Sequence, residues 1–201
     1  TAFGGNNNAR PYGQIDADYG LSNFDRRGRL TASFNYVLPY QGSGAARLIL
    51  GGWQTNGIVS LQTGSPLTVL NGADISLTGI GQDRVDIIGD PVLAGDRPPG
   101  EQILRWFNTA PFREPQPGTF GTLGRNTLLG PGQAVVDFSV FKNFVMPFAE
   151  SHRLEFRAEF FNLFNRVNLG NPNTSRINAL FGRITTAGDP RIIQLGLRYS
   201  F

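Results

Sequence analysis

Polar and apolar residues alternate along several stretches of this chain, most clearly in "HRLEFRAEFFNLFN". There, every second residue is apolar and nearly every residue between is charged: Leu154, Phe156, Ala158 and Phe160 alternate with Arg153, Glu155, Arg157 and Glu159. A period of two puts the two sets on opposite faces of a β-strand. A helical period would spread charges and rings over every side, so the pattern predicts a strand over residues 153–164.

The same alternation predicts four further strands, over residues 29–38, 52–63, 134–145 and 191–201. The last of these, "RIIQLGLRYSF", carries apolar residues at every second position up to its final phenylalanine. Within the third, Asp137 lies opposite Val136 and Phe138, whereas Lys142 interrupts the apolar face. We expect either a β-bulge or a lysine at a membrane interface at that position.

Short and long connections alternate between these strands. Residues 39–51 form a moderate link and "PFAES" a tight turn, whereas 64–133 and 165–190 are long and rich in Gly, Pro, Asn and Asp. A structureless loop of about 70 residues is uncommon in a compact soluble domain. Outer-membrane barrels combine strands of about 9–11 residues with short periplasmic turns and long extracellular loops. We therefore predict an all-β, antiparallel segment of a transmembrane β-barrel, with both long connections extracellular.

The charged face of the strand over 153–164 is expected to meet water. One charged side chain at the midplane of a barrel's lipid face costs about 2–4 kcal/mol, so several would cost on the order of 10 kcal/mol. We therefore predict that the lumen is faced by Arg153, Glu155, Arg157 and Glu159. By the same reasoning, the lipid is faced by Leu195, Leu197 and Tyr199.

Aromatic residues agree with an orientation in which the last strand ends in the periplasm. They would then form two girdles, as is typical of outer-membrane barrels. The periplasmic girdle would contain Tyr36, Tyr40, Trp53, Phe144, Phe148, Tyr199 and Phe201. The outer girdle would contain Phe24, Phe160, Phe161 and Phe164.

Composition removes several classes of function. Hydrophobic residues make up 40% of the 201 residues, and no apolar stretch reaches the roughly 18–20 residues of a membrane-spanning helix. The net charge is +3 and the 18 Lys and Arg are scattered among acidic residues, so no nucleic-acid surface is expected. The first residues lack an initiator methionine and a signal-peptide core, so we expect a piece of a longer protein.

We predict no catalytic residue, no metal and no cofactor, and therefore no enzyme. The chain has no Cys and a single histidine, His152, which we interpret as a solvated residue beside a turn rather than a zinc ligand or triad member. Glu155 and Glu159 could be an acid–base pair for glycoside hydrolysis, but their arginine neighbours favour ion pairing in a lumen. The glycine-rich "GTFGTLGRNTLLGPG" lacks the ending of a phosphate loop. Three loop carboxylates lack EF-hand spacing and are interpreted as turn residues: Asp83, Asp86 and Asp90.

Substrate contact, if this chain makes any, is expected from the segment 64–133. Side chains suited to stacking or to binding anions occur there: Arg84, Trp106, Phe107, Phe112 and Arg113. The alternative is that these side chains fold the segment upon itself, as in compact surface loops.

A series of stretches resembles the C-terminal part of Oar-like TonB-dependent outer-membrane receptors, a group often fused to a carboxypeptidase-regulatory-like domain. The stretches are "ADYGLSNFDRRGRLTASFNYVLP", "GGWQTNGIVSLQTGSPLTV", "DRVDIIGDP", "WFNTAPF", "PGTFGTLGRNTLLGPG", "VDFSVFKNF", "LEFRAEFFNLFNRVNLGNP" and "FGRITTAGDPRIIQLGLRYSF". Each is weak alone, but the ordered series is specific and covers nearly everything after Asp18.

The resemblance implies a barrel of about 22 strands that holds a plug domain and imports a substrate, with energy supplied through the TonB protein. The plug, the TonB-contacting segment and most strands are absent from this chain. Five strands are fewer than the roughly eight of the smallest single-chain barrels, so we expect a curved, incomplete sheet with open edges. The implied partners are outer-membrane lipid, the remainder of the barrel and plug, the TonB complex and the outer-membrane assembly machinery.

The last strand resembles the C-terminal signal that the assembly machinery recognises in outer-membrane barrels. The residues that carry this resemblance are Leu195, Leu197, Tyr199 and Phe201. An alternative from another class, a secreted β-sandwich carbohydrate-binding module, would explain the alternation by burying the apolar faces between two sheets. It explains neither the alternating loop lengths nor the aromatic terminus.

Overall fold

The computed structural model of the chain describes residues 18–40, 42–79, 81, 83–145 and 152–201. The predicted turn "PFAES" and Phe148 lie outside these residues. The chain divides into two compact units. The first, here called the sheet unit, comprises residues 28–62, 133–168 and 188–201. The second, here called the loop unit, comprises the described residues among 18–27, 63–132 and 169–187.

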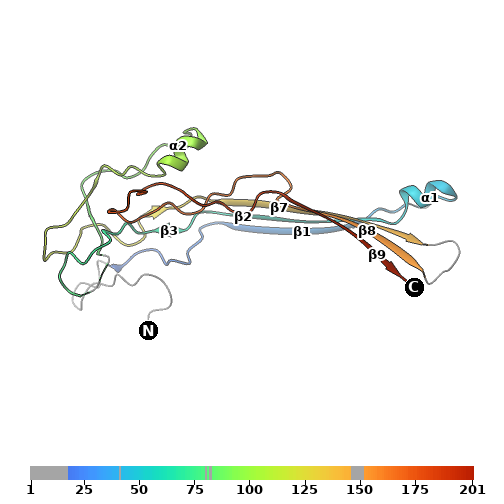
Figure 1. Ribbon diagram of the computed structural model, residues 1–201, viewed down its shortest axis with the longest axis horizontal. Coiled ribbons are helices and arrows are strands. Elements are labelled where there is room, and N and C mark those ends of the chain that lie inside the picture. The colour runs from blue at the N-terminus through green and yellow to red at the C-terminus, as the bar shows by residue number, and fades with distance from the viewer. Residues whose placement is uncertain (1–17, 41, 80, 82, 146–151) are drawn as a thin grey trace. The chain divides into compact units, whose positions relative to one another are not determined.

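The sheet unit is built on five long strands. They are β1 (Arg29–Val37), β2 (Trp53–Gln62), β7 (Gln133–Val145), β8 (Arg153–Phe161) and β9 (Ile192–Ser200). Their order is β1-β2-β7-β8-β9, and each strand is antiparallel to its neighbours (Figure 1). The predicted all-β antiparallel fold is confirmed. The sheet does not close on itself, so β1 and β9 are its edges.

The strand predicted over 153–164 ends at Phe161, three residues early. The cause is Asn162, whose φ of 50° is a left-handed conformation that an extended strand cannot contain. Its backbone N–H donates to Asp137 Oδ1 at 2.9 Å, and its side-chain amide donates to the carbonyl oxygens of Arg166 and Asp189 at 2.9 and 3.1 Å. Asn162 therefore closes this end of β8 with its own hydrogen bonds.

The connection between β1 and β2 contains a short helix that the sequence pattern did not predict, α1 (Ala45–Leu50). Glycines with positive φ bracket it, Gly44 at 68° and Gly52 at 73°. A Cβ at Gly52 would lie 2.5 Å from the carbonyl oxygen of Asn143, so the return from α1 into β2 requires glycine. Figure 1 shows α1 at the end of the sheet where β9 and the chain end.

The segment predicted as one long loop contains regular structure. Two short ladders pair β3 (Pro66–Leu67) with β6 (Leu128–Leu129) and β4 (Asp86–Ile87) with β5 (Phe112–Arg113). A six-residue helix, α2 (Pro99–Leu104), lies between β4 and β5 in the chain. No helix in the described part of the chain is long and apolar enough to cross a membrane.

A small hydrophobic core holds the loop unit together. Its buried members are Leu67, Val69, Val85, Phe107, Phe112, Leu123 and Leu128. Phe107, Phe112 and Phe181 pack edge to face, with ring centroids 5.3–5.7 Å apart. Isolated bridges join 169–187 to the same unit, among them Leu70 with Ser175. The loop unit is thus a folded body rather than a flexible connection.

Candidate functional site

One face of the five-stranded sheet is apolar across its whole width. A central row of paired residues contains Phe34, Gly57, Phe138, Phe160 and Ile193. The next row contains Tyr36, Thr55, Val140, Ala158 and Leu195. Side chains on this face that are at least half exposed are Leu30, Phe34, Tyr36, Ile193, Leu195, Leu197 and Tyr199. An exposed apolar patch of this kind marks contact with a membrane or with another protein.

The opposite face carries the charges of β8. Arg157 lies between two carboxylates, with a guanidinium nitrogen 3.0 Å from Glu155 and another 3.9 Å from Glu159. The guanidinium also stacks over the ring of Phe141 at 4.8 Å. On β9, Arg198 is paired with Glu155 in register. Both glutamates share one arginine, so the charges form a row of ion pairs along β8, as is typical of a sheet face in contact with water.

The loop-unit residues predicted to contact a substrate fall into two groups. Phe107 and Phe112 are 2% and 3% exposed within the core, and Arg84 is buried in an ion pair with Asp18. For these three, the structure matches the alternative in which the segment folds upon itself. Trp106 is half-buried and donates its indole N–H to the carbonyl of Leu129 at 2.8 Å. Substrate contact stays a prediction for Trp106 and for the exposed Arg113.

A pocket of about 260 Å³ adjoins Trp106. Its walls are mainly apolar, and lining residues include Val92, Leu93, Arg97, Gln102, Trp106 and Leu129. The guanidinium of Arg97 donates to the carbonyl oxygens of Ala94 and Arg105, each at 2.8 Å. Because the volume falls below the roughly 300 Å³ of typical ligand sites, the pocket suits one small apolar group at most.

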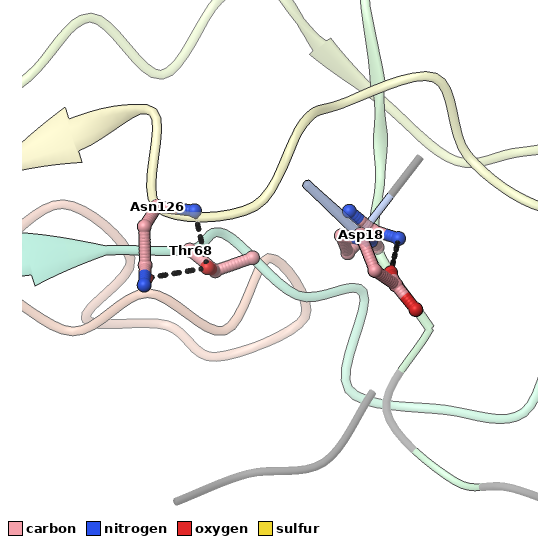
Figure 2. Close-up of polar contacts among 4 residues, drawn as sticks. Asp18, Thr68 and Asn126 are labelled. Carbon is pink, nitrogen blue, oxygen red and sulfur yellow. Dashed lines mark hydrogen bonds and ion pairs between the residues drawn. The ribbon is translucent and has the colours of Figure 1, made fainter. Parts of the chain in front are cut away.

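Asn126 organises the start of the loop unit, a role that sequence reasoning missed. Figure 2 shows Asn126 beside Thr68: the Thr68 hydroxyl donates to Asn126 Oδ1 at 2.9 Å and accepts from its backbone N–H at 2.8 Å. The Asn126 amide donates to the carbonyl of Leu21 and to Asn23 Oδ1, at 2.6 and 2.7 Å. Its φ of 53° lies in the left-handed region, where asparagine is enriched. The asparagine in "GRNT" was therefore the signal that the sequence offered.

Comparison with known families decides the class of this sheet. The model of a family described as an outer membrane beta barrel domain matches residues 1–194. The chain belongs to this family. It is a protein of the bacterial outer membrane. Neither the curated proteins nor the solved structures gave a significant match.

Membership in the barrel family accounts for the two faces of the sheet. Strands of outer-membrane barrels alternate between apolar side chains toward lipid and polar ones toward the interior. The row from Phe34 to Ile193 has the composition of a lipid face, and the ladder around Arg157 has that of an interior wall. Secondary structure and family therefore agree on a barrel wall.

Lys142 is the one charge among described strand residues that lies on the apolar face of this barrel wall. It pairs with Trp53 on β2 and Phe156 on β8 without interrupting either ladder, so the β-bulge alternative is excluded. Its ammonium group donates to the carbonyl oxygens of Ile49, at 2.9 Å, and Gly51. Only 2% of the residue is exposed. The alternative of an interfacial lysine stays a prediction.

The last strand of the barrel wall ends beside His152. Nδ1 of His152 hydrogen-bonds the Tyr199 hydroxyl, and its ring lies 5.6 Å from that of Tyr199 and 6.4 Å from that of Phe201. His152 therefore packs against the aromatic end of the chain, while its side chain stays partly exposed to solvent. Phe201 itself is 90% exposed. The role of this strand in assembly stays a prediction.

The loop carboxylates considered for calcium bind separate backbone groups. Asp83 accepts from the N–H groups of Ile75 and Ser76, at 2.7 and 2.6 Å. Asp86 accepts from Thr122 N, and Asp90 from Val92 N. Among the residues that the structure describes, no group of three or more His, Cys, Asp or Glu side chains could hold a metal ion.

Proposed function

We propose that this chain is the C-terminal part of a TonB-dependent transporter, which binds a substrate at the cell surface and imports it through the barrel. The observation that carries the proposal is the loop unit. A long segment that folds around its own core, with Phe107, Phe112 and Phe181 packed together, can hold its exposed residues in fixed positions for binding, which a simple connection between strands cannot.

The proposal includes an orientation. The α1 end of the sheet is periplasmic and the loop unit is extracellular, as the alternation of short and long connections suggests. Arg153, Glu155, Arg157 and Glu159 then face the lumen, where a plug domain and water replace lipid. The ion pairs of Arg157 support this assignment, because a lumen lets the charges keep both their partners and their hydration.

The β-sandwich alternative has no observation in its favour. A sandwich would bury the phenylalanine face against a second sheet. Phe34 and Ile193, on that face, are 50% and 54% exposed. We also propose that the protein is not an enzyme, since Glu155 and Glu159, the residues considered for hydrolysis, share one arginine.

Genetic comparison tests the transport proposal. One strain lacks this gene and a second lacks the gene for the TonB protein, and both are grown on an array of sole carbon and iron sources. The proposal predicts that the first strain fails on a subset of the sources on which the second fails. Failure on sources that the second strain still uses would contradict energy-dependent import.

Conductance separates a plugged transporter from an open pore. The complete protein is reconstituted into planar lipid bilayers in potassium chloride. A barrel filled by a plug is expected to pass no steady current, whereas a porin leaves an aqueous channel. A persistent, stepwise conductance from the complete protein would contradict the proposal while leaving the barrel fold intact.

A further inference from the structure

Three consecutive apolar side chains of α1 are exposed. Leu48, Ile49 and Leu50 are 53%, 67% and 48% exposed. The patch adjoins the apolar face of the sheet, because the carbonyl oxygen of Ile49 accepts hydrogen bonds from the side chains of Trp53 and Lys142, which lie on that face. A six-residue helix is too short to be stable alone, so something must hold it in this position.

The C-terminal carbonyls of α1 are held by side chains of the sheet. Ile49 O accepts from the Trp53 indole N–H at 2.8 Å and from Lys142 Nζ at 2.9 Å. Gly51 O accepts a second bond from Lys142. The last carbonyls of a helix lack partners within the helix, and in lipid each unsatisfied group is costly. These bonds lower the cost of placing the end of α1 in apolar surroundings.

The charge of Lys142 is covered in the same arrangement. Its ammonium group lies 5.1 Å from the ring centroid of Trp53 and 5.0 Å from that of Phe144. A cation between aromatic faces and carbonyl oxygens is compensated without water. Lys142 therefore joins α1 to the apolar face of the sheet and presents no free charge to the lipid.

We propose that α1 is an interfacial anchor that inserts Leu48, Ile49 and Leu50 among the phospholipid chains of the periplasmic leaflet, and that Lys142 positions it there. The leaflet rests on the orientation given under Proposed function. The exposed Arg47 of α1 supplies a cation for lipid phosphates, as in other interfacial helices. Lipid is favoured over a protein partner because the patch is held against a face of the sheet that has the composition of a lipid face.

Depth-dependent quenching tests the lipid contact. The chain has no cysteine, so a single cysteine at Leu48, Ile49 or Leu50 carries a fluorescent NBD label in the complete protein without other cysteines. Vesicles of phosphatidylethanolamine and phosphatidylglycerol contain doxyl-labelled phosphatidylcholine. A blue-shifted emission that the doxyl lipid quenches is expected at all three positions.

A matched control is available on the other short helix. Leu104 ends the six-residue α2 as Leu50 ends α1, and it is 61% exposed. Label at Leu104 is expected to emit as in water and to resist quenching. Equal, water-like emission at 49 and 104 would overturn the anchor. A blue shift at 49 without quenching would mean that protein, a second copy included, covers the helix, and would also overturn it.

Substitutions at Lys142 test its positioning role. In the protein labelled at residue 49, Lys142→Met removes both bonds to α1 and is expected to lose much of the quenching, whereas Lys142→Arg retains it. Heat-modifiable migration on a denaturing gel verifies that the barrel is folded in each variant. Unchanged quenching in a folded Lys142→Met protein would overturn the role assigned to Lys142, and loss of quenching in Lys142→Arg alone would do the same.

Discussion

At Gly121 the chain of the loop unit passes so close to its neighbour that a side chain has no room. A Cβ there would overlap the carbonyl oxygens of Arg84 and Val85, which are backbone atoms and cannot turn away. The glycine-rich stretch around Gly121, which lacks the ending of a phosphate loop, therefore serves packing. Single residues of this kind decide whether the loop unit can form its core.

Gly121→Ala is expected to destabilise the loop unit by about 1–3 kcal/mol, the usual cost of overpacking. Gly100→Ala in α2 is the control, because a Cβ at that position would meet no atom within 4 Å beyond its chain neighbours and the backbone of its own helix. Limited proteolysis of the folded protein measures the difference. Faster cleavage of the loop unit in Gly121→Ala alone is the expected result, and equal rates in both variants would contradict the packing argument.

Asp74 is expected to make one turn of the loop unit sensitive to acid. Burial raises the pKa of Asp74, but hydrogen bonds from the N–H groups of Gly79, Thr78 and Leu77 and from the Ser76 hydroxyl outweigh it, so the pKa is lowered overall. A carboxyl whose folded pKa is depressed contributes stability above its unfolded pKa, and this stability is lost as pH falls through the folded value.

The turn over 74–79 is therefore expected to loosen as pH falls below the ordinary range of a carboxyl group. Amide hydrogen exchange at Gly79, whose N–H donates to Asp74 at 2.8 Å, measures this loosening. Asp74→Asn removes the titrating group. In this variant, the protection of the Gly79 amide against exchange, corrected for the intrinsic exchange rate, should not change with pH over the same range. The same acid-dependent loss in Asp74→Asn would point to another group.

At the scale of elements, periodicity decided what could be predicted from the sequence. The five long strands were predictable because each repeats its two-residue period over nine or more residues. The two-residue strands β3 and β4 and the six-residue α1 are too short to show any period. Phe107 and Phe112 were ambiguous since a core and a ligand site both favour aromatic rings. Lys142 was ambiguous until the register of β7 was known.

Adjacent residues of β7 test the two faces of the sheet. Val140, on the apolar face, pairs with Thr55 and Ala158. Val140→Arg is expected to lower the free energy of unfolding by about 2–4 kcal/mol, because the charge would enter lipid. Ser139→Arg is the control, since Ser139 pairs with Glu159 on the polar face and its cation would find a partner. Urea unfolding in lipid vesicles measures both, and equal losses would contradict the assignment of faces.

At the scale of the whole molecule, the C-terminal strand is an edge whose backbone groups need a partner. In a closed barrel that partner is another strand, and assembly in the outer membrane must bring the two together. Phe201, Tyr199 and His152 form an aromatic cluster at this end of β9. Its exposure suits recognition by the assembly machinery.

Phe201→Gln in the complete protein is expected to reduce the amount assembled in the outer membrane, whereas Phe201→Tyr keeps the aromatic ring and should be tolerated. Transport per assembled molecule should change less than the assembled amount. Immunoblotting of outer-membrane fractions measures the level. Normal levels of Phe201→Gln would count against the assembly signal.

One face of this sheet meets lipid and the other meets the barrel interior. The most direct measurement is the accessibility of nitroxide labels at each position from 135 to 141 of β7, in vesicles, to oxygen and to a water-soluble nickel complex. We expect a period of two, with labels at positions 136, 138 and 140 accessible to oxygen and labels at the other positions accessible to the nickel complex. A profile without that period, or with the opposite phase, would contradict it.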